Sequence, residues 1–351
     1  MPPASRTAPR SLPALPWSGS HYVGIDENGM GPRLGPLIVT SVLARVDGAR
    51  GAKLATSKPS GAFAARIGDS KKLFAGGDST LGEAWARAIA ARTARAAAEL
   101  APGPHAPRPS TPAELLSTVA LDPEATLRAP CPSHHADLCW GSGGEAFAAD
   151  DASVADCTKD LDRLATRGLE VLGVRVAIVC ARKLNDAVEA GLSRFDVDLH
   201  TMERLALAAR DDAGEHVYAF CGKVGGFDFY GDRFGPLGGR LHTVLCEGRA
   251  RSEYQVAGVG RLAFLRDADD THLIVGLASL VGKWVRDHLM RRVVRWHRAH
   301  VPDAPEASGY HDPVSSRFIE ATALVRKKLR VDPLCFERTS LGKKEAKRAG
   351  V

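Results

Sequence analysis

The chain has 351 residues, with 47 lysines and arginines against 41 aspartates and glutamates, so its formal net charge is +6. Hydrophobic residues make up 44% of the chain and charged residues 25%, which excludes a wholly disordered or fibrous protein and predicts a globular fold with a sizeable core. The sequence contains no run of 18 apolar residues, so it predicts no membrane-spanning helix.

The N-terminal part of the chain changes character at residue 21. Residues 1–20 are rich in proline without a long apolar block, which predicts a disordered leader rather than a signal peptide. A short apolar run over 21–26, a glycine-punctuated segment over 27–36 and a second apolar run over 37–46 predict a strand, a turn and a strand. Residues 45–66 are small and polar, which predicts a loop.

The middle of the chain predicts a helix followed by an insertion. An alanine-rich segment favours a helix over about 80–100. Residues 101–132 contain eight prolines, which predicts irregular structure, and the segment 141–156 is rich in glycine, serine and alanine. Together they indicate an inserted Pro/Gly-rich loop region at about 101–165.

Strands and helices alternate beyond the insertion, which predicts an α/β domain over 21–320. The expected strands are 169–181, 216–221, 239–248 and 252–260, and the expected helices are 200–210 and 273–299. The last helix has one apolar face, and its opposite face carries six basic residues: Lys283, Arg286, Arg291, Arg292, Arg295 and Arg298.

The excess of positive charge belongs to the C-terminus. Residues 321–351 carry nine basic residues against three acids, which leaves the rest of the chain balanced. A basic tail of this kind indicates an anionic partner or serves solubility alone, and we expect it to act as an auxiliary arm.

The first candidate site is the acid pair Asp26 and Glu27, which ends the first strand and precedes Gly29, Met30 and Gly31. Adjacent carboxylates repel each other unless a cation lies between them, and a hard divalent cation such as Mg²⁺ prefers oxygen ligands. Glycines allow backbone N–H groups to approach a phosphate closely. The alternative interpretation is a solvated turn with two surface acids.

Three further motifs have a functional and a structural interpretation. Lys71 and Lys72 could hold a phosphate backbone, or they could lie at a capped helix end. The acid cluster in 266–270 could bind metal, or it could complement the dipole of the helix that follows. Tyr310 lies in a polar loop that on its own predicts only a turn.

The order and spacing of these motifs resemble a known family. The chain contains, in succession, G-I-D-E-x-G-x-G-P-x-x-G-P, then D-S-K-K-L, then an acid ten residues before A-S-L-V-G-K-x-x-R-D, and finally G-Y in a loop. This succession resembles ribonuclease HII, the type 2 ribonuclease H family, over residues 21–44, 66–74 and 170–320.

The resemblance implies a ribonuclease H-like α/β fold with a mixed central sheet flanked by helices. It implies an endonuclease that cleaves the RNA strand of RNA/DNA hybrids, or ribonucleotides embedded in a DNA duplex. It also implies carboxylate-bound Mg²⁺ or Mn²⁺, one ion activating water and the other stabilising the leaving oxygen. Hybrid nucleic acid is then the expected partner.

The resemblance also assigns roles residue by residue. It gives the metal-binding and catalytic roles to Asp26, Glu27 and Asp269, the last of which lies ten positions before Ser279. It implies phosphate contacts for Lys71, Lys72 and Lys283, and a place beside the ribonucleotide junction for Tyr310. The backbone N–H groups of Gly29 and Gly31 would also lie at that junction.

Two positions depart from the family pattern. Met30 stands where the family has an arginine, which removes a cationic contact at the junction. The family's third acid follows a strand shortly before a glycine, and the corresponding place here is Cys221-Gly222. A thiolate is a soft ligand that suits Mg²⁺ poorly. Either the site has fewer acids or another acid substitutes, with Asp228 and Asp267 as the nearest candidates.

Two other functions remain open at this stage. The Cys221 departure motivates a hybrid-binding protein of the same fold with little or no cleavage. Met30 motivates a nuclease of the same fold that acts on other nucleic acids.

The seven cysteines are irregularly spaced, which argues against a secreted disulfide framework and predicts a reducing, cytoplasmic location. Zinc ligation within 131–139 would need Cys131, His134 or His135, and Cys139. The spacing there lacks a paired second half, so chance composition is the favoured interpretation.

Overall fold

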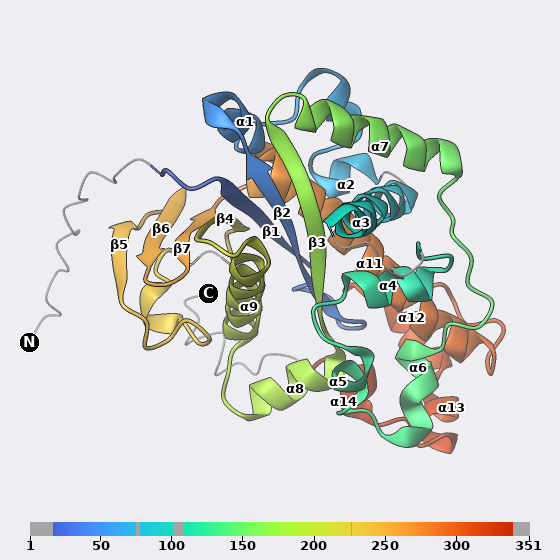
Figure 1. Ribbon diagram of the computed structural model, residues 1–351. Coiled ribbons are helices and arrows are strands. Elements are labelled where there is room, and N and C mark those ends of the chain that lie inside the picture. The colour runs from blue at the N-terminus through green and yellow to red at the C-terminus, as the bar shows by residue number, and fades with distance from the viewer. Residues whose placement is uncertain (1–16, 75–77, 101–107, 226, 340–351) are drawn as a thin grey trace, which may run out of the picture.

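The computed structural model describes residues 17–74, 78–100, 108–225 and 227–339, so most of the predicted leader and the end of the basic tail lie outside the described residues. A seven-stranded sheet forms the centre of the molecule, in the order β3-β2-β1-β4-β7-β6-β5 (Figure 1). The strands are β1 (His21–Asn28), β2 (Leu37–Val46), β3 (Leu169–Val179), β4 (Val217–Gly222), β5 (His242–Cys246), β6 (Arg251–Val256) and β7 (Gly260–Leu265).

The sheet is mixed. Strands β1, β4 and β7 run parallel to one another, whereas the neighbours on both sides pair antiparallel. The carboxyl ends of the three parallel strands therefore lie at the same edge of the sheet. The expected fold class, an α/β domain with a mixed central sheet flanked by helices, is confirmed.

Helices cover both faces of the sheet (Figure 1). Helix α9 (Arg194–Ala213) packs on the face that carries Val23 and Ile25 of β1. Helices α3 (Thr80–Leu100), α7 (Asp151–Ala165) and α11 (Leu273–Arg298) pack on the opposite face. Each face has its own apolar core, because alternate residues of a strand point to opposite sides.

Glycines bring α11 close to β1. A Cβ on Gly24 would lie 2.3 Å from the backbone carbon of Ile274, and one on Gly282 would lie 2.1 Å from Oδ1 of Asn28. Real Cβ atoms do not approach other atoms so closely, so larger residues at 24 and 282 would push the helix away from the strand. The acids at the end of β1 are therefore held against α11.

The prolines of the insertion start helices instead of preventing them. Pro112 is the first residue of α4 (Pro112–Val119), and Pro123 precedes α5 (Glu124–Arg128). Proline suits the first helical turn because the N–H it lacks has no partner there. The expectation of irregular structure over 101–132 is thus wrong for these two helices, and residues 101–107 lie outside the described part of the chain.

Two more short helices, η3 (Ser133–His135) and α6 (Ala136–Trp140), complete this region. The predicted loop over 45–66 also contains a helix, α1 (Gly48–Ala55), followed by η1 (Gly61–Ala65). The small residue Gly51 lets α1 lie directly against the backbone of Gly168, so tertiary packing overrides a weak local helix signal.

The segment after α11 returns to the β1–β2 end of the sheet. Its helices are α12 (Pro313–Ala321), α13 (Ala323–Lys328) and α14 (Pro333–Phe336). Phe318 and Phe336 pack in a third apolar cluster with Leu34, which lies between β1 and β2. Residues 323–339 of the basic tail therefore form part of the folded structure. Among the helices of the described residues, none has the length and apolarity needed to cross a bilayer.

Candidate active site

Asp26 and Glu27 lie at the carboxyl end of β1 and converge on the end of β4. A Cβ atom on Gly222 would lie 2.9 Å from Oδ1 of Asp26 and 3.6 Å from Oε2 of Glu27. The two carboxylates come from opposite faces of β1 and both lean toward Gly222, which has no side chain to occupy the space between them. The structure thus brings together two acids of the predicted site.

The position beside the acids is Gly222, and Cys221 faces away from it. In the parallel pairing Ile25 is opposite Cys221, so the next residue along, Gly222, lies beside Asp26. The side chain of Cys221 is fully buried in the core under α9, where burial raises the pKa of its thiol. A side chain at 222, in contrast, would point at the two carboxylates.

Asp269 and Ser279 approach Asp26 from the other end of the site. Asp269 is half-buried in the one-turn helix α10 (Ala268–Thr271), and its charge acts on both Asp26 and Glu27. The side chain of Ser279, on α11, hydrogen-bonds to Asp26, and its hydroxyl also lies 3.1 Å from that of Ser70. The three acids predicted from the sequence therefore share one electrostatic environment.

Burial and mutual repulsion raise the pKa values of these acids. Burial, followed by the charges of Glu27 and Asp269, raises the pKa of Asp26 well above its usual range. Burial and the charge of Asp198 raise the pKa of Glu27 to about 8. Burial raises the pKa of Asp269 as well. Lys71 opposes the shift at all three groups.

We expect the metal-free protein to lose stability as the pH rises from about 4.5 to about 8. Folded Glu27 keeps its proton up to about pH 8, whereas unfolded Glu27 releases it near its ordinary value of 4.5. The unfolded state binds fewer protons in this window, so the free energy of unfolding falls with pH. Urea unfolding in EDTA at several pH values measures how steeply the free energy of unfolding falls with pH. This dependence should be shallower in Glu27→Gln, and an equal dependence in both proteins would contradict the raised pKa of Glu27.

Lys71 and Lys72 flank the acids from the short helix α2 (Ser70–Leu73). Asp69 caps this helix by accepting a hydrogen bond of 2.9 Å from the backbone N–H of Lys71. Both lysines are exposed, and Lys72 forms ion pairs of 3.2 Å with Asp270 and 3.5 Å with Asp69. Lys71 is the cation whose charge reaches Asp26, Glu27 and Asp269.

Two buried arginines, Arg286 and Arg338, lie against the glycine loop after Glu27. Gly29 has a φ of +88°, and a Cβ there would lie 2.5 Å from Nε of Arg286. Arg338, which is 3% exposed, donates from Nη1 to the carbonyl oxygens of Gly29 at 2.6 Å and Met30 at 3.3 Å. Burial lowers the pKa of Arg338 to about 9. The Met30 side chain packs partly buried against the core under α9, whereas Gly31 is exposed.

A basic groove begins where this loop meets α11. It has a volume of about 960 Å³ and runs along α11 past Tyr310. The guanidinium of Arg286 lies 4.5 Å from the ring centre of Tyr310, which is 40% exposed. Lys283 lines the groove and is paired with Asp287. The basic residues that line the groove are Lys283, Arg286, Arg291, Arg295 and Arg298.

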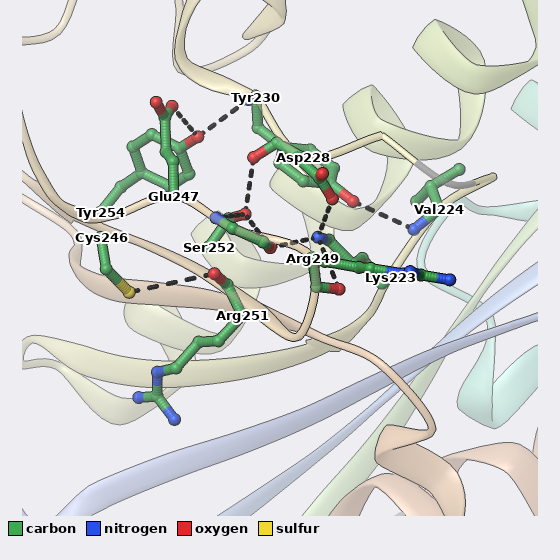
Figure 2. A network of polar contacts seen from close by, with 11 residues as sticks. Lys223, Val224, Asp228, Tyr230, Cys246, Glu247, Arg249, Arg251, Ser252 and Tyr254 are labelled. Atoms are coloured by element: carbon green, nitrogen blue, oxygen red, sulfur yellow. Dashed lines mark hydrogen bonds and ion pairs between the residues drawn. The ribbon is translucent and has the colours of Figure 1, made fainter. Parts of the chain in front are cut away.

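The two acids suggested as substitutes for the missing one lie in other environments. Asp228 is ion-paired with Lys223, whose Nζ also donates to the carbonyl oxygen of Gly248 at 2.6 Å (Figure 2). The backbone oxygen of Asp228 accepts from the Ser252 hydroxyl at 2.6 Å. Asp267 is exposed, has a φ of +51° and lies 3.5 Å from Arg266.

Asp198 is an acid near the site that the sequence analysis missed. It lies on α9 and is completely buried, and its charge acts on Asp26 and Glu27. The predicted helix began at residue 200, whereas α9 begins at Arg194 after a capping box formed by Ser193 and Asp196. A helix beginning at 194 would have shown Asp198 within the apolar stripe of Phe195, Leu199 and Met202.

These side chains suit a hard divalent cation in their chemistry. The available donors are carboxylate oxygens, and both oxygens of Asp198 are buried without a hydrogen-bond partner. Among the described residues, no three or more histidine, cysteine, aspartate or glutamate side chains are arranged to hold a metal ion. The oxygen donors therefore fit Mg²⁺ or Mn²⁺ but are not already gathered around one point.

Comparison with known proteins gives distant structural similarities. No family model and no curated protein matches the chain. The structure of the PCNA:RNase HII complex from Archaeoglobus fulgidus aligns at 12% identity and a TM-score of 0.37, covering 92% of this chain and 98% of that chain. Ribonuclease H2 from Pyrococcus horikoshii OT3 aligns at 15% identity and a TM-score of 0.38, covering 94% and 99%.

Bst-RNase HIII in complex with Mn²⁺ aligns at 11% identity and a TM-score of 0.43, covering 94% of this chain and 69% of that chain.

Proposed function

We propose that this protein is a metal-dependent endonuclease that cleaves the RNA strand, or embedded ribonucleotides, of RNA/DNA hybrids. The observation that supports it is the convergence of Asp26 and Glu27 at the end of β4, within the electrostatic reach of Asp269 and Lys71. Three acids beside the exposed Lys71 favour a site for a cation together with a phosphodiester.

Each group has a role that follows from its position. Asp26, Glu27 and Asp269 would hold Mg²⁺ or Mn²⁺, which when bound would activate water and stabilise the leaving oxygen. Lys71 is exposed and can orient a phosphate beside the acids. Tyr310, stacked on Arg286, offers a flat exposed surface to a base or sugar.

The remaining predicted contacts lie around these groups. Gly31 is exposed, and the glycine loop can present its backbone to the junction. The basic groove along α11 would then take the nucleic acid backbone, which makes binding salt-dependent. Lys72 and Lys283 are already paired with acids, so they would contribute more weakly than Lys71.

A second function is supported by the glycine at 222. Without a side chain there, the site has one acid fewer than the family it resembles, and this favours a hybrid-binding protein with little or no cleavage. Both functions would use the same fold and the same basic groove. They differ in whether the bound hybrid is cleaved.

We expect the purified protein to cleave a labelled RNA/DNA hybrid only when Mg²⁺ or Mn²⁺ is present. Asp26→Asn should lose at least about 99% of this activity, because a metal ion contributes several kcal/mol of transition-state stabilisation. The matched control is Asp212→Asn, an exposed acid of α9 that pairs with Arg175 of β3. Single-stranded RNA and duplex DNA test the other substrates. Tight hybrid binding without cleavage under either metal would contradict the proposal and support the binding protein.

A further inference from the structure

Asp198 is a buried acid without any visible compensation. It is 0% exposed, and neither of its carboxylate oxygens has a hydrogen-bond partner among the residues that the structure describes. Other deeply buried acids are satisfied. Asp160 pairs with Arg66 at 2.7 Å and Arg163 at 3.0 Å, and Glu203 accepts from the backbone N–H of Leu237 at 2.7 Å. A buried carboxylate left in this state costs several kcal/mol, so something outside the described contacts must neutralise it.

The position of Asp198 indicates what could neutralise it. Helix α9 packs on the face of the sheet that carries Ile25 and Cys221, and Asp198 lies on the packed side of that helix. Its charge acts on Asp26 and Glu27, which converge at Gly222, and on the buried Cys221 and Tyr230. Lys71 acts on Asp26, Glu27 and Asp269 and is exposed. Asp198 therefore lies beside other acids and buried weak acids.

Two species can neutralise such a group: a proton held permanently, or a cation shared with the neighbouring acids. A permanently protonated Asp198 would still leave its hydroxyl and carbonyl oxygen unpartnered among apolar side chains. A cation bound by Asp198 together with Asp26 and Glu27 would give the oxygens of Asp198 a partner, and these side chains would have to draw together around it, since they are not gathered around one point here. It would also explain why an acid is placed on the apolar stripe of α9.

We propose that Asp198 is a further ligand of the divalent cation site and supplies, from α9, the carboxylate that the glycine at 222 does not. This proposal rests on the proposed function, because it places Asp198 beside Asp26 and Glu27 in one site for Mg²⁺ or Mn²⁺. It adds a residue from the opposite face of the sheet, so the site would bridge β1 and α9.

The test measures Mn²⁺ binding to the full chain by calorimetry, together with the shift in melting temperature that Mn²⁺ produces. Asp198→Asn keeps the shape of the side chain. We expect it to weaken Mn²⁺ binding by roughly ten-fold or more and to remove most of the shift in melting temperature. Even residues that only hydrogen-bond to metal ligands change metal affinity by roughly 10–100-fold. Glu203→Gln is the matched control, because Glu203 is a buried acid of the same helix with backbone partners. Asp198→Ser is a second neutral variant should the asparagine variant fold poorly.

The outcomes separate this proposal from the proposed function. If Asp26→Asn loses Mn²⁺ binding while both Asp198 variants bind as the wild type does, Asp198 is a protonated core residue and only this proposal fails. If the wild type binds no Mn²⁺, both proposals fail. Loss of binding in the Asp26 and Asp198 variants, with retention in Glu203→Gln, supports both.

Discussion

Replacing Gly222 with aspartate is expected to strengthen Mn²⁺ binding by roughly ten-fold or more and to raise the rate of hybrid cleavage, since changes around a metal commonly alter its affinity 10–100-fold. A Cβ at 222 would lie within 4 Å of the carboxylates of both Asp26 and Glu27. The contact at 2.9 Å is with the end of the flexible Asp26 side chain, which can move aside. An additional carboxylate would therefore enter the site at the end of β4, beside those of Asp26 and Glu27.

The neighbouring substitution is the control for this gain. Cys221 is fully buried among apolar side chains under α9, so Cys221→Asp should destabilise the protein by about 3 kcal/mol or more without strengthening Mn²⁺ binding, because it leaves an unpaired charge in the core. Gly222→Ala tests the effect of the Cβ alone. Tighter Mn²⁺ binding in Cys221→Asp than in Gly222→Asp would show that the missing acid belongs at 221.

Replacing Arg338 with methionine is expected to lower the free energy of unfolding by about 3 kcal/mol, since hydrogen bonds to charged groups contribute roughly 1.5–3 kcal/mol each and their loss leaves buried carbonyls unpaired. Arg338 donates from Nε to Gly35 at 2.9 Å as well as from Nη1 to Gly29 and Met30. The loop that follows Glu27 depends on these bonds.

Urea unfolding measures this loss, and hybrid cleavage by the folded variant measures its effect on the site. Arg338→Lys keeps the charge but cannot reach three carbonyls with one ammonium group, so an intermediate loss is expected. An unchanged urea midpoint in Arg338→Met would show that the loop holds its shape alone. Such a result would indicate that residue 338 has only the auxiliary role that the sequence predicts for the basic tail.

Local patterns in the sequence were enough to predict much of the fold. The alanine-rich helix over 80–100 and the apolar face of the helix over 273–299 correspond to α3 and α11, because both patterns are long and periodic. The strand β7 was not predicted, because the expected strand over 252–260 ends at Gly260, the residue where β7 begins. The helices of the insertion depend on packing, which local composition does not show.

The candidate site was predicted in part for a related reason. Asp26, Glu27 and Asp269 lie in motifs that can be recognised in the sequence, and the structure places them in one electrostatic environment. Distinguishing Cys221 from Gly222 required the register between β1 and β4, which a single sequence does not contain. Identifying Asp198 from the sequence would have required knowing where α9 begins and which of its faces packs on the sheet. Arg338 acts on Gly29 across 309 positions of sequence, a contact that no local pattern predicts.

This last contact has a consequence for how the protein is made. Contacts between residues far apart in sequence form late, because a long chain must be closed before they can be made. During synthesis, the acid pair and the loop after it leave the ribosome near the beginning, whereas Arg338 leaves some three hundred residues later. The acids of the site therefore emerge early, whereas the arginine that supports the neighbouring loop emerges almost last. A nascent chain thus has an incomplete site until the segment after α11 has folded back onto the sheet.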